Sequence, residues 1–222
     1  MKKNFYSGTI IVSSLFLSMF LAFMFPIQVS ANSENLESIS VEDVFPEEEV
    51  QQLQERNKNL PIYSDKDENG NMYLVSTRST GTYPSRPGVI LVTDDYYKNL
   101  IPTGHAAIVY SSDKVVESLQ NGVCYGNNDW YRSKNTCTAV AVSGTTSQQD
   151  SFAAVWCSGK NGKPYNFIYT DVDTREKFYC SQLVWAAYKD CYGIDLNTSI
   201  FGNAVHPGEL VDSSHTYVIY RK

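Results

Sequence analysis

From residue 87 onward, short apolar runs bounded by turn residues alternate with segments in which apolar residues recur at helical spacing. The former are typical of buried strands and the latter of helices facing a core. The predicted strands span residues 88–93, 104–110, 114–119, 136–142 and 216–220. The predicted helices span residues 147–159 and 178–192. Strands followed by helices and one last strand indicate an α+β domain with a mainly antiparallel sheet.

The second predicted helix has the clearer pattern. From Leu183 onward its apolar residues cover most of the circumference, which is typical of a buried helix, and Gly193 is suited to ending it in the left-handed conformation. In the first helix, we expect Phe152, Val155 and Trp156 to face the core.

The N-terminal 31 residues have the pattern of an export signal. Lys2 and Lys3 precede an uncharged apolar run over residues 10–25. The small residues that a signal peptidase cleaves after follow, ending at Ala31. The run is shorter than the ~20 residues that span a bilayer, so we interpret 1–31 as a signal peptide cleaved near Ala31. An uncleaved anchor is the alternative. We expect a secreted or cell-surface protein with no stable membrane insertion after cleavage.

Residues 32–80 are acidic and sparsely apolar. Val50 and Leu53 suggest a short helix, loosely attached to an N-terminal arm; a pro-segment covering the active site is the alternative. Asn69-Gly70 predicts a hairpin turn. The sequence from Asp65 also imitates a calcium loop, but Ser76 stands where a bidentate Glu is needed, which favours the hairpin.

Composition and charge narrow the function. A hydrophobic content of 42% excludes wholesale disorder. The formal charge is -6, and the predicted mature chain, without Lys2 and Lys3, has 16 basic and 24 acidic residues and a charge of -8. Nucleic acid is therefore not an expected partner.

Cys180 is the first candidate for chemistry. It lies in the first turn of helix 178–192, where unpaired N–H groups and the helix dipole favour a thiolate. Cys191 is ~16 Å further along the helix and cannot form a disulfide with it. An inert buried cysteine is the alternative.

A nucleophilic thiolate requires a base and a group that orients it. Among the three histidines, His206 falls in a loop and His215 beside the last strand, whereas His105 begins a strand after Gly104. If residues 111–113 form a three-residue loop, His105 and Glu117 share a face as diagonal neighbours. A two- or four-residue loop would place them on opposite faces, unless a bulge intervenes.

These segments together resemble a known family. The relevant motifs are Gly88-Val89-Ile90-Leu91-Val92, Gly104-His105-Ala106-Ala107-Ile108, Val115-Val116-Glu117, Gly162-Lys163-Pro164-Tyr165-Asn166 and Tyr179-Cys180-Ser181-Gln182-Leu183-Val184. They are similar to the permuted, YiiX/YebB-like branch of the NlpC-type papain-like superfamily, in which the histidine strand precedes the cysteine helix. Val89 departs from the acid more often found there.

The resemblance implies a circularly permuted papain-like core over residues 81–222, with the cysteine helix packed on the sheet. By position, Cys180 matches the nucleophile, His105 the base and Glu117 the third member. Tyr165 matches a tyrosine that lines the cleft, and we assign substrate binding to Tyr165, Tyr179 and Ser181. No cofactor is implied.

The expected function is an exported cysteine peptidase or amidase that cleaves amide bonds, with peptides or peptidoglycan stem peptides as substrates. A lipid or acyl-ester hydrolase or acyltransferase, and a non-catalytic binding protein, are the alternatives. The wall substrate is the weaker part, because an anionic wall repels a protein of charge -8.

The remaining cysteines leave two questions. They lack metal-ligand spacing, so no metal is expected. In an exported chain, Cys124 with Cys137 and Cys157 with Cys191 are one possible set of disulfides, and four reduced thiols are the other. Cys180 is the cysteine expected to stay free. The oligomeric state does not follow from the sequence.

Overall fold

In a computed structural model, residues 40–67, 70–75, 80–95 and 104–222 are described. The chain divides into Met1–Glu37, which lies outside the described residues together with the predicted signal peptide, and Ser38–Lys222, the unit treated below. In the described ranges, no helix is both long and apolar enough to span a bilayer.

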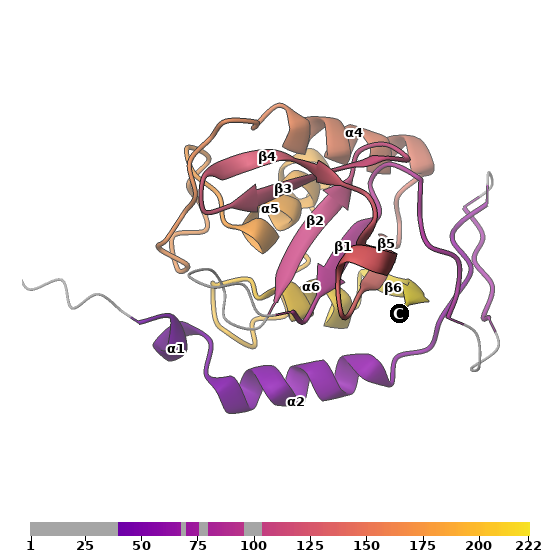
Figure 1. Cartoon of the computed structure of the whole chain (residues 1–222), viewed down its shortest axis with the longest axis horizontal. Helices are drawn as coiled ribbons and strands as arrows, with labels where there is room; N and C mark the ends of the chain where they lie inside the picture. The colour runs from indigo at the N-terminus through magenta and orange to yellow at the C-terminus, as the bar shows by residue number, and fades with distance from the viewer. Residues whose placement is uncertain (1–39, 68–69, 76–79, 96–103) are drawn as a thin grey trace, which may run out of the picture. The chain divides into compact units, whose positions relative to one another are not determined.

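One antiparallel sheet organises this unit (Figure 1). Its strands are β1 (Ile90–Thr93), β2 (His105–Val109), β3 (Lys114–Leu119), β4 (Gly122–Asn127), β5 (Thr138–Val142) and β6 (Thr216–Arg221). Their spatial order is β4-β3-β2-β1-β5-β6, and each neighbouring pair is antiparallel. The sequence predicted each of these strands except β4.

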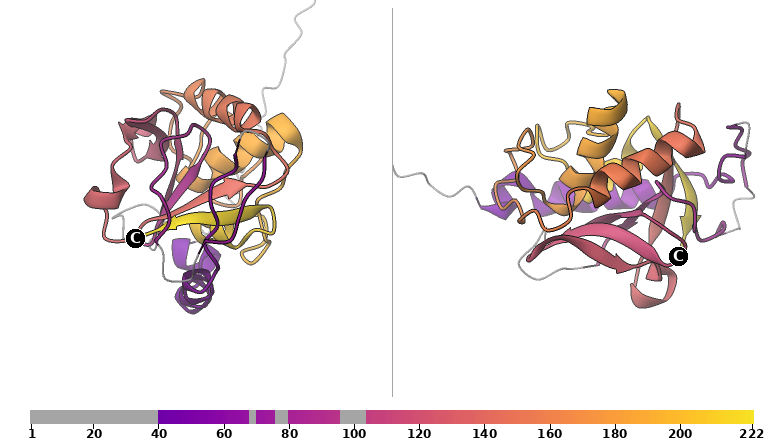
Figure 2. Two further views of the ribbon diagram at one scale, coloured as in Figure 1. Left: turned by 90° about the vertical axis from the view of Figure 1, so that its right-hand side faces the viewer. Right: turned by 90° about the horizontal axis from the view of Figure 1, so that it is seen from above.

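Six helices accompany the sheet in the described residues, and three of them pack directly on its strands. They are α1 (Val41–Val44), α2 (Glu47–Lys58), α3 (Trp130–Ser133), α4 (Ser147–Ser158), α5 (Cys180–Tyr192) and α6 (Pro207–Asp212). Helices α4 and α5 pack on β2 and β3, and α6 packs on β1, β5 and β6 (Figures 1 and 2). The predicted α+β class, with the cysteine helix packed on an antiparallel sheet, is confirmed.

Both faces of the sheet are buried, which explains why its strands are continuous apolar runs. Ile90 and Val92 contribute to the core beneath the helices, while Val89 and Leu91 contribute to a second core around Trp130 of α3. Side chains along a strand alternate between the faces, so every position of β1 is apolar or buried.

The buried face of α4 differs from the prediction. Phe152 and Val155 are 56% and 55% exposed, and Trp156 is half-buried. The fully buried residues are instead Asp150, Ala153, Ala154 and Cys157. Asp150 accepts charged hydrogen bonds inside the protein, and this fixes the rotation of the helix.

The predicted helix near the N-terminus exists, but it is not loosely attached. Val50 and Leu53 are completely buried, and α2 packs against α6. The Asn57 Nδ2 atom donates a hydrogen bond of 2.9 Å to the carbonyl of Gly208. The sparse apolar stripe is enough to dock the helix because Gly208 leaves room for Leu53.

The segment after α2 runs along the sheet. Tyr63 and Leu74 form an antiparallel bridge, as the predicted hairpin requires, while Asn69 of its turn lies outside the described residues. Ile62 forms a parallel bridge with Val218 of β6.

All five cysteines are free thiols in the structure, so the proposed pairs Cys124–Cys137 and Cys157–Cys191 are not formed. Cys124 lies on β4 and Cys137 precedes β5, at separate positions of the sheet order.

Candidate active site

The turn that carries Cys180 is held by hydrogen bonds on both sides. Cys180 is the first residue of α5 and is completely buried. The N–H of Tyr179, the N-cap residue, donates to Gln182 Oε1 at 3.1 Å. The Ser118 hydroxyl of β3 donates to the carbonyl of Phe178 at 2.6 Å. Helix and sheet therefore fix the backbone immediately before the thiol.

His105 and Glu117 meet as the strand register predicts. Ala107 is opposite Glu117, which confirms the three-residue loop. The His105 Nε2 atom lies 2.6 Å from Glu117 Oε2, and the imidazole ring stacks on Trp130 with centroids 5.5 Å apart. The carboxylate thus fixes the orientation of the ring.

Cys180 and Glu117 both interact with the imidazole of His105. Burial lowers the pKa of His105, but the hydrogen bonds and charges of Cys180 and Glu117 outweigh it and raise the pKa to about 9. The imidazole is therefore charged at neutral pH, as it is in a thiolate–imidazolium pair. The β2–β3 hairpin and the start of α5, which are distant in sequence, bring together the three residues expected to act in catalysis.

Tyr165 lies close to this group. It is 4% exposed, and its ring packs against Phe167 with centroids 4.8 Å apart. Burial first, and then the charge of Cys180, raise the pKa of Tyr165 far above its ordinary value, so the phenol stays neutral. It is placed to present a neutral hydroxyl beside the thiol.

Tyr179 and Ser181, the other residues assigned to substrate binding, are completely buried and bond to the chain itself. The Tyr179 hydroxyl donates to the carbonyl of Tyr169 at 3.2 Å and accepts from the N–H of Val205 at 2.9 Å. The Ser181 hydroxyl donates to the carbonyl of Val205 at 2.6 Å. Both hydroxyls therefore hold nearby loops, and their assignment to substrate binding stays a prediction.

Sequence reasoning did not single out Gln182 and Asn166. Gln182 Oε1 also accepts from Asn166 Nδ2 at 3.0 Å, and Gln182 Nε2 donates to three carbonyls within 171–174. The amide therefore ties the helix start to the loop after Tyr165. A polar residue at the third position of a helix is the sequence signal that was present.

The other two histidines do not pair with Cys180 in the described contacts. His206 caps α6, accepting from the N–H of Gly208 at 3.0 Å, and burial lowers its pKa to about 3. His215 is exposed beside β6. Within the part of the chain that the structure describes, no cluster of three or more His, Cys, Asp or Glu could hold a metal ion.

This fold is that of a papain-like enzyme with permuted chain order. Residues 94–217 match the family described as permuted papain-like amidase enzymes, YaeF/YiiX, C92, and the chain belongs to that family. The match confirms the resemblance drawn from the motifs.

The chain is also similar to two individual proteins. The uncharacterized protein YycO of Bacillus subtilis (strain 168) is 30% identical over 164 residues, and the match covers 68% of this chain and 63% of YycO. The chain thus spans less than two thirds of that relative. The crystal structure of the metalloprotein YiiX from Escherichia coli O157:H7 has a TM-score of 0.52 and 15% identity, covering 64% of this chain and 99% of YiiX. The second likeness concerns the fold alone.

Proposed function

We propose that this protein is a cysteine hydrolase that cleaves amide bonds, with Cys180 as nucleophile, His105 as base and acid, and Glu117 as the group that orients His105. The observation that carries the proposal is the 2.6 Å contact between His105 and Glu117, with Cys180 interacting with the same imidazole. Family membership supports the class of reaction.

The reaction follows from these positions. The Cys180 sulfur forms a bond to the carbonyl carbon of the substrate, and the C–N bond breaks as His105 gives its proton to the leaving nitrogen. Water then attacks the thioester, His105 takes one of its protons, and the acid is released with the thiolate restored. The N–H of Cys180, at the start of α5, has no acceptor in its own helix and is suited to hydrogen-bond the developing oxyanion.

We propose peptides as the substrate class, including the stem peptides of peptidoglycan. The wall polymer itself is not electrostatically attractive for a chain of formal charge -6. A soluble peptide fragment avoids this repulsion, so fragments are the better first substrates.

The test is turnover of wall-derived peptides, simple peptide amides and acyl esters by the purified protein and its variants. Cys180→Ser and His105→Ala are expected to reduce turnover by at least about 10³-fold while leaving the melting temperature close to the parent value. Cys191→Ser is the matched control, because that thiol is exposed at the opposite end of α5 and should not affect turnover.

Retained activity in both site variants would refute the assignment. Turnover of acyl esters without any peptide amide would make the protein an acyl-ester hydrolase instead.

We also propose that the protein is exported and cleaved near Ala31, as the charge and hydropathy of residues 1–31 suggest. The test is N-terminal sequencing of the protein recovered outside cells that express the full chain. A first residue of Asn32 is the expected result, and an intact Met1 on cell-retained protein would refute export.

A further inference from the structure

Phe45, which directly follows α1, is buried among aromatic rings near the active site. It is 3% exposed. Its ring centroid lies 5.4 Å from that of Tyr169, 5.3 Å from Phe201 and 5.2 Å from His206, each in an edge-to-face arrangement. Such edge-to-face pairs contribute beyond their buried area, so Phe45 fixes the positions of three rings from two loops.

One of these loops, residues 198–206, is held by hydrogen bonds to Glu209 of α6. Glu209 Oε1 accepts from the Thr198 hydroxyl at 2.6 Å and from the N–H of Ile200 at 3.1 Å. Glu209 Oε2 accepts from the N–H of His206 at 2.8 Å. The loop is therefore bound to α6 through Glu209, and Phe45 contacts it at Phe201 and His206.

The same loop forms hydrogen bonds with Tyr179 and Ser181, the two neighbours of Cys180 in the sequence. At Val205, the N–H donates to the Tyr179 hydroxyl and the carbonyl accepts from the Ser181 hydroxyl, at 2.9 and 2.6 Å. Tyr179 also donates to the carbonyl of Tyr169, another partner of Phe45. Phe45 is thus linked through two routes to the residues on either side of the thiol.

The segment that carries Phe45 is firmly attached further along. Arg221 of β6 donates to the carbonyls of Asn57 and Leu60 at the end of α2, at 2.8 and 3.2 Å. Lys66 Nζ lies 2.8 Å from Asp150 Oδ2 and donates to the carbonyls of Val142 and Thr145.

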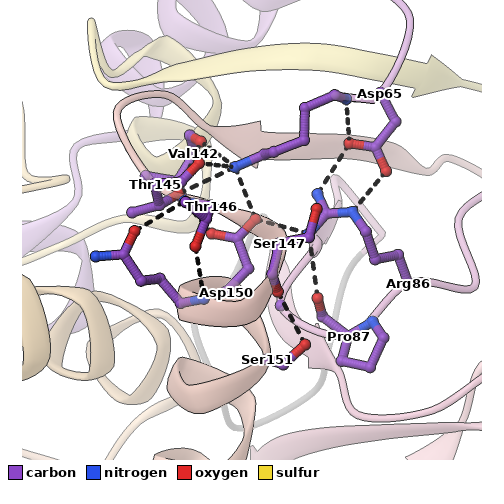
Figure 3. Close-up of polar contacts among 12 residues, drawn as sticks. Asp65, Arg86, Pro87, Val142, Thr145, Thr146, Ser147, Asp150 and Ser151 are labelled. Carbon is purple, nitrogen blue, oxygen red and sulfur yellow. Dashed lines mark hydrogen bonds and ion pairs between the residues drawn. The ribbon is translucent and has the colours of Figure 1, made fainter. Parts of the chain in front are cut away.

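Arg86 connects Asp65, next to Lys66, with Asp150 of α4. It donates to Asp150 at 2.6 Å and to both carboxylate oxygens of Asp65 at 2.8 and 2.9 Å (Figure 3). If this segment were a pro-segment that leaves the active site, Lys66 would have to come out of its buried ion pair with Asp150. Its side chain is only 2% exposed, so this step would be costly.

We propose that Phe45 is a positioning residue for Cys180, and that residues 40–67 are a permanent part of the folded protein and not a cover to be removed. Phe45 holds Tyr169 and the 198–206 loop, which in turn hold Tyr179 and Ser181. This inference rests on the proposed function, because it concerns the nucleophile of that reaction.

The test compares Phe45→Ala, Phe45→Leu and Ile62→Ala in the full chain. Phe45→Ala is expected to lower kcat by about tenfold or more with KM within about twofold, because a small misplacement of reacting groups lowers the rate of the chemical step. Phe45→Leu, which keeps much of the apolar volume, should recover most of the loss. Ile62→Ala is the matched control: it creates a cavity in the same segment, against Val218, and should lower stability without changing kcat.

A second measurement does not need a substrate. In an NMR titration of His105, Phe45→Ala should bring the pKa down from the parent value toward the ordinary value for histidine, because Cys180 moves away from the imidazole. Ile62→Ala should leave the titration unchanged. If the parent hydrolyses none of the substrates, the proposed function fails, whereas this titration still reports on the position of Cys180.

An increase in kcat for Phe45→Ala would mean that the segment covers the site, and would overturn the inference. Unchanged kcat together with an unchanged titration of His105 would overturn it as well. If Phe45→Ala does not fold, an intermediate loss in Phe45→Leu supports the inference and parent-like values refute it.

Discussion

The space around Glu117 is created by a missing side chain on the neighbouring strand. Cys124 of β4 is opposite Glu117, and Gly126 follows two residues later on the same face. A Cβ atom at Gly126 would overlap Glu117 Oε1. The glycine therefore allows the carboxylate to lie flat over β4 and reach His105. At the residue scale, the absence of one methyl group sets the geometry of the catalytic group.

Gly126→Ala is expected to push the Glu117 carboxylate away from His105. The loss of an orienting hydrogen bond should lower kcat by about 10- to 100-fold, while the strand itself tolerates alanine. Steady-state kinetics measure the change. Gly159→Ala, at the end of α4 with φ -65°, is the control and should retain parent activity; equal kinetics in the two variants would contradict this role of Gly126.

The pH dependence of turnover should follow His105. Its pKa is raised to about 9, so the imidazolium that protonates the leaving group is present below pH 9 and is lost as the pH rises through about 9. We expect kcat to fall over that range. Glu117→Gln removes one of the causes of the raised pKa and should move the decline to lower pH, which a pH–rate profile of both proteins measures. An alkaline limb at the same pH in both would contradict the assignment.

At the scale of elements, buried charge determines how α4 is oriented. Sequence reasoning placed the largest apolar residues of α4 inside, since apolar burial usually dominates. Asp150 instead occupies the interior because Lys66 and Arg86 neutralise it. Figure 3 shows Arg86 beside Asp150. Both cations come from segments that the helix pattern alone does not place nearby. The rotation of this helix was therefore not predictable from its own residues.

Lys66→Met should destabilise the fold, because it removes one cation from a completely buried carboxylate. The expected loss in the free energy of unfolding is about 3 kcal/mol, measured by urea denaturation. Lys58→Ala is the control: its ion pair with Glu55 is exposed, and no measurable change is expected. A parent-like urea midpoint for Lys66→Met would show that the ion pair does not hold the segment.

At the scale of the whole molecule, the sequence predicted what depends on local geometry. The length of the 111–113 loop predicted that His105 and Glu117 share a face, and the helix pattern placed Cys180 in the first turn of α5. The sequence did not predict the bonds of Tyr179 and Ser181 to Val205, because adjacency to Cys180 does not reveal contacts with a distant loop. Strand β4 was missed because its glycines and polar residues resemble a turn.

The thiol count provides a test of the whole structure. Under denaturing, non-reducing conditions, all five cysteines should react with a thiol reagent. In the folded protein, Cys191 should react faster than Cys137 and Cys157 because it is exposed. Cys137 and Cys157 should react slowly, since burial raises the pKa of Cys137 to about 12 and that of Cys157 further. A denatured count of three or one would indicate disulfides.

The segment after α2 has a consequence for self-association. Strand β6 lies at one end of the sheet order, and an open strand edge is a template for pairing with another chain. Here the carbonyl of Val218 accepts from the N–H of Tyr63, and the N–H of Arg221 donates to the carbonyl of Thr80. These bonds occupy part of the β6 edge. Tyr63 and Thr80 therefore reduce the number of free backbone groups through which two copies could pair edge to edge and begin to aggregate.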